Sequence, residues 1–356
     1  MRYTSTRTLQ ILRRCSRARP QFALLFCLLP FGFLACPGKP ASDTNNASPT
    51  PAMSPVTNPT ASPAAANAPV FDADRAFAHV RRMVEIGPRP AGSKELARTR
   101  EMIVNELRSY NLQVSVDEFD TRTPVGKRRM ANVTAELAGE SSDQIIIASH
   151  YDTKLVKEFR FVGANDSGSS TGTVMEIARV LALSHQNKKP RFTLRFVFFD
   201  GEEAFCENWD DCGTEKEPDN TYGSRRYVAQ LIDKDELKRV RALILLDMIG
   251  YKNLQIPRES TGTAWLTDII WTTARETNHA AQFVNESESI TDDHIPFLNA
   301  GINAVDLIQF GGYGEYWHTA EDTLDKISPQ SLKAVGDVVL ASLPRIEERL
   351  MNKNTR

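Results

Sequence analysis

The sequence has few cysteines and almost no net charge. Five of its 356 residues are cysteine, and only Cys206 and Cys212 lie beyond the first 36 positions. These two lack the paired spacing of a zinc finger, which excludes that kind of structural site. Outside the cytoplasm they could form a small disulfide loop, and two free thiols are the alternative. Forty-three basic against 45 acidic residues leave a formal charge of −2, which argues against a nucleic-acid-binding surface.

The first 36 residues differ from the rest of the chain. Six arginines precede the apolar run FALLFCLLPFGFLAC. A basic leader, a short apolar core and small residues are typical of a secretory signal, and the core is short for a membrane-spanning helix. The ending FLAC resembles the lipobox of bacterial lipoproteins, in which the cysteine, here Cys36, becomes the lipidated first residue of the mature chain. Cleavage by an ordinary signal peptidase near Ala35 is the alternative.

The segment after the leader, residues 37–70, is rich in Pro, Ala, Ser, Thr and Asn. It holds too few large apolar side chains to offset the entropy of ordering, so we expect a disordered tether. The chain is therefore expected to consist of a lipoprotein-type signal (1–36), this tether and a folded domain (71–356). This organisation predicts a protein of the bacterial cell envelope that faces the periplasm or the exterior and contacts the membrane through lipid alone.

From residue 71 onward, strand-like apolar stretches alternate with segments of helical spacing. Helices are expected over residues 71–87, 93–111, 170–186, 222–232, 264–280 and 328–350. Strands are expected over 112–119, 131–137, 144–150, 191–200, 242–250 and 303–310. Continuous apolar strands indicate burial on both faces of a sheet. The pattern predicts a three-layer α/β/α sandwich with a mixed, largely parallel central sheet.

Acidic and imidazole side chains stand where several of these strands end. The groups are His150, Asp152, Asp166, Glu202, Glu203, Asp247 and His318. Sheets of this class bind ligands beyond the carboxyl ends of their strands. Imidazole and carboxylate ligands suit zinc, which takes about three protein ligands in a catalytic site. The chain has six histidines, and a metal-binding or supporting role is credible for those beside acids in loops: His150, His294 and His318.

Two neighbouring glutamates, Glu202 and Glu203, follow the apolar stretch RFVFFDG. Because side chains alternate across a strand, adjacent residues point in different directions. One glutamate can therefore bind a metal while the other faces a substrate and carries protons. Ordinary solvated surface charge is the alternative for such a pair.

The strings HYD, GANDSGSSTG, DGEEAF, LLDMIG and WHT, in this order, resemble the zinc-dependent aminopeptidase superfamily. That superfamily also contains the glutaminyl-peptide cyclotransferases, and SHYDTK, FFDGEEAF, YGSR, DDHIPFL and WHT resemble this branch more closely. The resemblance extends from about residue 71 to the C-terminus. It implies an acyltransferase that converts the N-terminal Gln of peptides or proteins to pyroglutamate and releases ammonia.

The same resemblance implies roles for individual residues. One zinc ion per chain would be held by Asp166, Glu203 and His318. The catalytic acids would be Glu202, Asp247 and Asp292, with Glu202 as the proton shuttle. Aromatic walls of the substrate pocket would be Trp209 and Trp317.

The chain departs from the animal cyclotransferases at two places. They carry a histidine where this sequence has Asp306, and they have a disulfide near the HYD strand where this sequence has Ala148 and Ser149. The first difference concerns the hydrogen-bond network of the site. Neither difference touches the three residues implied to bind zinc.

The aminopeptidase branch uses the same framework with two zinc ions. There, His150 and Asp247 would hold the second ion and Asp166 would bridge the pair. This chain retains all three residues, so the number of ions stays open. The alternative function is therefore a two-zinc exopeptidase that hydrolyses N-terminal residues, and a non-catalytic binding module is a third.

The lipobox resemblance predicts that Cys36→Ser releases the protein from membrane fractions or stalls its processing. A single acyl chain binds membranes only marginally, so release by one substitution implies multiple acylation at Cys36. Fractionation and mass measurement of the mature N-terminus test this. A wild-type protein that is freely soluble and begins at another residue would contradict it.

Overall fold

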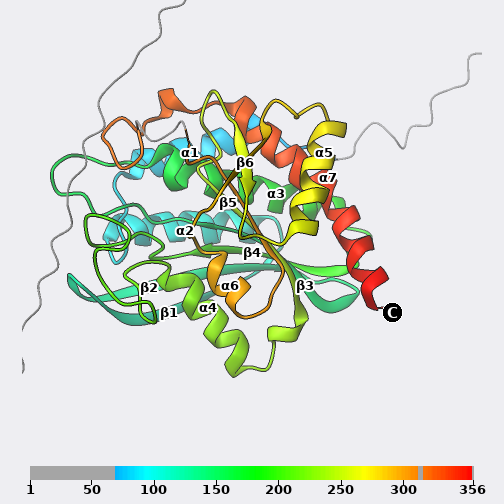
Figure 1. Cartoon of the computed structure of the whole chain (residues 1–356), viewed down its shortest axis with the longest axis horizontal. Helices are drawn as coiled ribbons and strands as arrows, with labels where there is room; N and C mark the ends of the chain where they lie inside the picture. Colours follow the sequence, from blue (N-terminus) through cyan, green and yellow to red (C-terminus); the bar gives the residue numbers. More distant parts are fainter. Residues whose placement is uncertain (1–68, 312–315, 355–356) are drawn as a thin grey trace, which may run out of the picture. The chain divides into compact units, whose positions relative to one another are not determined.

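The structure is a computed structural model that describes residues 69–311 and 316–354 (Figure 1). The expected signal segment with Cys36, and all but the last two residues of the expected tether, lie outside these ranges. No helix in the described part of the chain is both long enough and apolar enough to span a bilayer.

A six-stranded sheet forms the centre of the folded chain, in the order β1–β2–β4–β3–β5–β8. The strands are β1 (Gln113–Thr123), β2 (Gly126–Leu137), β3 (Ser141–His150), β4 (Phe192–Phe199), β5 (Val240–Asp247) and β8 (Ala304–Ile308). The hairpin of β1 and β2 joins β4 in antiparallel pairing, whereas β4, β3, β5 and β8 are mutually parallel. The sheet is therefore mixed and mostly parallel, as the sequence predicts.

Helices cover both faces of this sheet. One face packs against α1 (Ala73–Ile86), α2 (Lys94–Ser109), α3 (Ser170–Ser184), α5 (Ala264–Glu276) and α7 (Pro329–Asn354). The other face packs against α4 (Tyr222–Asp233) and α6 (Ile295–Asn299). Figure 1 shows α4 and α6 below the sheet and α1, α3 and α7 above it. The predicted three-layer sandwich is confirmed.

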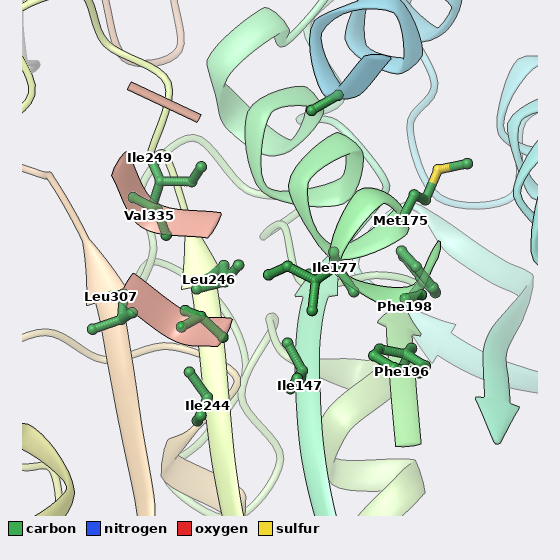
Figure 2. Packing of buried hydrophobic residues seen from close by; sticks show 14 of the residues in the cluster. Ile147, Met175, Ile177, Phe196, Phe198, Ile244, Leu246, Ile249, Leu307 and Val335 are labelled. Carbon is green, nitrogen blue, oxygen red and sulfur yellow. The ribbon is translucent and has the colours of Figure 1, made fainter. Parts of the chain in front are cut away.

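The central strand β3 shows why its sequence is continuously apolar. Ile145 and Ile147 belong to the core on the α3 side, and Ile146 and Ala148 belong to the core on the α4 side. Figure 2 shows Ile177 of α3 lying over Ile147. Each of these isoleucines stabilises the fold by about 1.5–3 kcal/mol when fully buried. A strand buried on both faces needs apolar residues at every position.

Several elements differ from the expectation. The small parallel sheet of β6 (Ile256–Glu259) and β7 (Phe283–Glu288) and the short helix α6 were not predicted. Strand β2 begins at Gly126 rather than residue 131, because its polar first residues pair with β1 beyond the core. Backbone pairing, rather than an apolar pattern, forms that end of the hairpin. Helix α5 stops at Glu276, short of the expected residue 280.

Candidate active site and metal centre

The parallel strands deliver their carboxyl ends to one edge of the sheet. His150 is the last residue of β3 and Asp247 the last of β5. Glu202 and Glu203 follow β4 and are only 5% and 4% exposed. A solvated surface pair would be exposed, so the surface-charge alternative for these glutamates is wrong.

Asp166, Glu203 and His318 form one cluster of converging ligand atoms. Nε2 of His318 lies 3.4 Å from Oδ2 of Asp166. It lies 3.2 Å from Oε1 and 3.0 Å from Oε2 of Glu203, but it hydrogen bonds only to Oε1. Buried Oε2 is therefore left without a hydrogen-bond partner. The structure thus brings together the three residues that the family resemblance assigns to zinc.

His150, Asp166 and Asp247 form a second cluster beside the first. Nε2 of His150 lies 3.1 Å from Oδ1 of Asp247 and 3.2 Å from Oδ1 of Asp166. Asp166 directs one oxygen to each cluster, so it is placed to bridge them. The geometry accommodates one ion or two.

The loop that carries Asp166 is held by a distant carboxylate and a buried arginine. Asp322 accepts hydrogen bonds from the backbone N–H groups of Asn165 (2.8 Å) and Asp166 (3.1 Å). The guanidinium of Arg89 donates to the carbonyls of Val162 (2.6 Å) and Gly163 (2.9 Å). The sequence analysis missed Asp322 and Arg89, because no spacing or periodicity connects them to the loop.

The turn that carries the two glutamates is held by Asp152. Its Oδ1 accepts from the N–H of Glu202 at 3.2 Å and its Oδ2 from the N–H of Glu203 at 3.4 Å. The two side chains then separate. Glu203 reaches His318, whereas Oε2 of Glu202 lies 3.6 Å from Nδ1 of His150 and borders a pocket. The neighbouring carboxylates therefore face different surroundings, as the sequence predicts.

Aromatic rings fix the orientation of His318. Its imidazole stacks on Trp317 at 3.9 Å between ring centroids, and Phe161 meets it edge-on at 5.7 Å. The backbone of His318 is left-handed, with a φ of 52°. That conformation is uncommon for a residue with a side chain and persists where the surroundings enforce it. His318 is thus held in a single direction, toward Asp166 and Glu203.

A pocket of about 240 Å³ opens beside the clusters. Its lining residues include Glu202, Trp209, Asp247, Asp292 and Trp317, together with Met248, Ile290, Ile308 and Phe310. The first five are those that the resemblance places around the substrate. The four apolar residues were not anticipated, since they lie in segments read only as strand or loop. A pocket of this size, apolar with a few acids, suits a small side chain that carries one polar group.

Burial and charge shift the pKa values of the site. Burial raises the pKa of Glu202 well above its usual range, and the carboxylates of Asp292 and Glu203 raise it further. Burial likewise raises the pKa of Asp247 to about 7. Burial opposes a charged His318, but Glu203 and Asp166 outweigh that effect and raise its pKa to about 9. The clustered carboxylates therefore favour a cation at this position, whether a proton or a metal ion.

The donor atoms fit zinc. Each cluster offers carboxylate oxygens and one imidazole nitrogen, a set typical of catalytic zinc sites. Buried Oε2 of Glu203 accepts no hydrogen bond, and a metal ion would satisfy this acceptor. A candidate metal centre is thus present at the strand ends.

The remaining histidine beside acids, His294, belongs to neither cluster. It is buried, with Nε2 at 3.0 Å from Oγ1 of Thr261 and at 3.4 Å from Glu259. Its Nδ1 lies 3.7 Å from Asp306, the position at which the resemblance implies a histidine. An imidazole therefore neighbours this position, although it comes from a different part of the chain.

Cys206 and Cys212 are joined by a disulfide, so the free-thiol alternative is wrong. The bond closes a loop that contains Trp209. The disulfide thereby constrains the chain around Trp209, which lines the pocket.

Residues 132–343 match the peptidase family M28. The glutaminyl-peptide cyclotransferase of Bos taurus is 31% identical over 255 residues, which cover 62% of this chain and 68% of that protein. The crystal structure of Acidobacteriales bacterium glutaminyl cyclase shares 32% identity at a TM-score of 0.72, covering 82% of this chain and 100% of that one. A leucine aminopeptidase precursor from Bacteroides thetaiotaomicron shares 28% identity at a TM-score of 0.69, covering 77% and 97%.

The family match covers strands β3, β4, β5 and β8, the second half of β2 and the segments that carry both ligand clusters. They also explain why the order of the motifs along the chain resembles that of zinc-dependent aminopeptidases and cyclotransferases. The chain belongs to peptidase family M28.

Proposed function

We propose that the protein is a glutaminyl-peptide cyclotransferase, which converts the N-terminal Gln of peptides or proteins to pyroglutamate and releases ammonia. The observation that carries the proposal is the placement of Glu202. This buried acid borders an apolar pocket with two tryptophans, next to a metal-ligand cluster. Similarity to named cyclotransferases and glutaminyl cyclases supports the same reading.

The reaction forms one C–N bond and breaks another. The α-amine nitrogen of the substrate attacks its own γ-carbonyl carbon, and the side-chain amide nitrogen leaves as ammonia. Glu202 takes a proton from the amine and returns it to the leaving nitrogen, which a single carboxyl group can do without added water. Trp209 and Trp317 enclose the folded Gln side chain, and Asp247 and Asp292 accept hydrogen bonds at the pocket wall.

We propose one zinc ion per chain, held by Asp166, Glu203 and His318, since these three side chains converge and the reaction needs no second ion. A zinc ion supplies Lewis acidity that polarises a carbonyl and stabilises negative charge on its oxygen. The chain itself contributes the orientation of these ligands, through Asp322 at the loop of Asp166 and Trp317 at His318.

A two-zinc aminopeptidase is the second candidate, and one observation favours it. The His150, Asp166 and Asp247 cluster is a complete ligand set adjacent to the first. In that enzyme Glu202 would deprotonate a water molecule instead of the substrate amine. The aromatic pocket beside Glu202 and the similarity to glutaminyl cyclases favour cyclisation.

We also propose that residues 1–36 and 37–70 act as a lipoprotein signal and a tether for the catalytic domain at the bacterial cell envelope. The support is the basic leader, the ending FLAC at Cys36 and the Pro- and Ser-rich composition that follows. The substrates would then be peptides or proteins in the periplasm or outside the cell.

We expect the purified chain to cyclise a Gln-initiated peptide and to leave a Leu-initiated peptide intact. Cyclisation removes one ammonia molecule, whereas hydrolysis releases a whole residue. Mass spectrometry of both products after incubation distinguishes the two. Release of the N-terminal residue from the Leu peptide would identify an aminopeptidase instead.

Glu203→Gln should lower the zinc content well below the value of about one ion per chain that we expect for the wild type. The amide is a neutral ligand and leaves the metal charge less compensated. Elemental analysis after gentle purification measures the content. Exposed Glu348 on α7 provides the control, because Glu348→Gln makes the same chemical change far from the clusters. Two tightly held ions in the wild type would contradict the one-zinc assignment.

Glu202→Gln should retain zinc and lower kcat by roughly 10²-fold or more, the usual scale for losing a positioned acid–base group. KM should change less, because proton transfer matters in the transition state. Steady-state kinetics with a Gln peptide and metal analysis on the same preparation test this. Loss of zinc from Glu202→Gln, with zinc retained in Glu203→Gln, would require the two roles to be exchanged.

A further inference from the structure

The pocket wall that carries Trp209 is irregular chain. Between β4 and α4, residues 204–220 form no helix or strand and contain a single isolated bridge, Gly213 with Pro218. Regular backbone pairing does not fix Trp209, although its side chain lines the substrate pocket. Other contacts must hold this part of the wall.

One end of the disulfide is firmly anchored. The ammonium of Lys154 donates to the carbonyls of Ala204 and Cys206, both at 2.8 Å. In addition, Oδ2 of Asp219 accepts from the N–H groups of Phe205 and Cys206, both at 2.9 Å. Lys154 and Asp219 are both buried, which strengthens these charge-assisted bonds. The backbone at Cys206 is therefore fixed from two directions.

The chain beyond Cys206 is held much less firmly. Asn208 and Asp211 hydrogen bond to each other and so stabilise only a local turn. The carbonyl of Trp209 accepts a 3.2 Å hydrogen bond from Asn220. The disulfide links Cys212 back to the anchored Cys206 over a sequence separation of 6, with Trp209 inside the ring.

We propose that the Cys206–Cys212 disulfide is a positioning element of the substrate pocket, which holds Trp209 in its binding orientation. The inference rests on the proposed function, since it assigns Trp209 to substrate binding. Closing a short ring restricts the conformations of the residues within it. If the pocket wall is already ordered, no binding free energy is lost in ordering it when the substrate binds. The bond thus acts on substrate affinity.

The catalytic acids lie outside the ring. Glu202 and Glu203 precede Cys206, and Asp152 holds their backbone N–H groups independently of the disulfide. Loss of the bond should therefore leave zinc binding and the proton-transfer step unchanged. An effect on KM without one on kcat separates pocket positioning from general destabilisation.

The test compares the oxidised full-length protein with the Cys206→Ser/Cys212→Ser double variant. We expect KM for a Gln-initiated peptide to rise about tenfold in the variant, which corresponds to about 1.4 kcal/mol of binding. We expect kcat and zinc content to stay within about twofold of the wild type. Trp209 contacts the bound substrate and the transition state equally, and the groups that transfer the proton are not altered. A mild reductant should raise KM of the wild type and have no effect on the variant.

Two further measurements distinguish a displaced Trp209 from a general loss of stability. Leu231→Ala removes buried packing from α4 without touching the loop, so it should lower the melting temperature and leave KM unchanged. Acrylamide quenching of tryptophan fluorescence should increase in the double variant, since Trp209 becomes more accessible. This readout does not depend on which reaction the enzyme performs.

An unchanged KM and unchanged quenching in the double variant would overturn the inference, as would loss of zinc in parallel with the rise in KM. Failure of the proposed function would be seen differently. The wild type would then release a residue from the Leu peptide, or convert neither peptide, while the quenching comparison would still decide whether the disulfide holds Trp209.

Discussion

The organisation of the site depends on several carboxylates buried around two imidazoles. Within the described residues, the ion pairs of Asp166, Glu202, Glu203 and Asp247 are all with His150 or His318. Buried negative charges repel one another and are costly without compensation. The arrangement is stable only if protons or a cation neutralise part of this charge. The fold therefore maintains a strong preference for positive charge at the place where parallel strands end.

The surrounding protein supplies the rigidity that this preference requires. Arg89 is fully buried and donates to the carbonyls of the loop ahead of Asp166. Asp322 and Asp152 accept hydrogen bonds from the N–H groups of the loops that carry the ligands. Aromatic rings confine His318. Side chains that contact backbone thus place the ligands, and the sheet behind them provides the fixed base. Precise placement of this kind is what a metal-dependent acid–base site needs.

Much of the fold and part of the site could be predicted from the sequence. The buried strands are predictable from their apolar runs. The polar residues that end these runs, such as His150 and Asp247, are predictable from the same pattern. The grouping of Asp166, Glu203 and His318 came from the order of family motifs, because no local spacing relates residues so far apart. Arg89 and Asp322 were not predicted. Both bind backbone groups, and because any donor or acceptor of suitable reach can do this, no sequence pattern marks them. The first residues of β2 and the small sheet of β6 and β7 were not predicted either, because their pairing involves polar residues.

The distance along the chain between the ligands has a consequence for assembly. Glu203 and His318 are 115 residues apart, and Asp322 lies 157 residues from Asn165, whose N–H it accepts. An unfolded chain holds no preformed version of this site, so metal affinity belongs to the native state alone. By thermodynamic linkage, an ion that binds only the folded protein adds its binding free energy to the free energy of unfolding. With the proposed zinc ion bound, metal supply and conformational stability would be coupled: loss of the ion would also lower the free energy of unfolding.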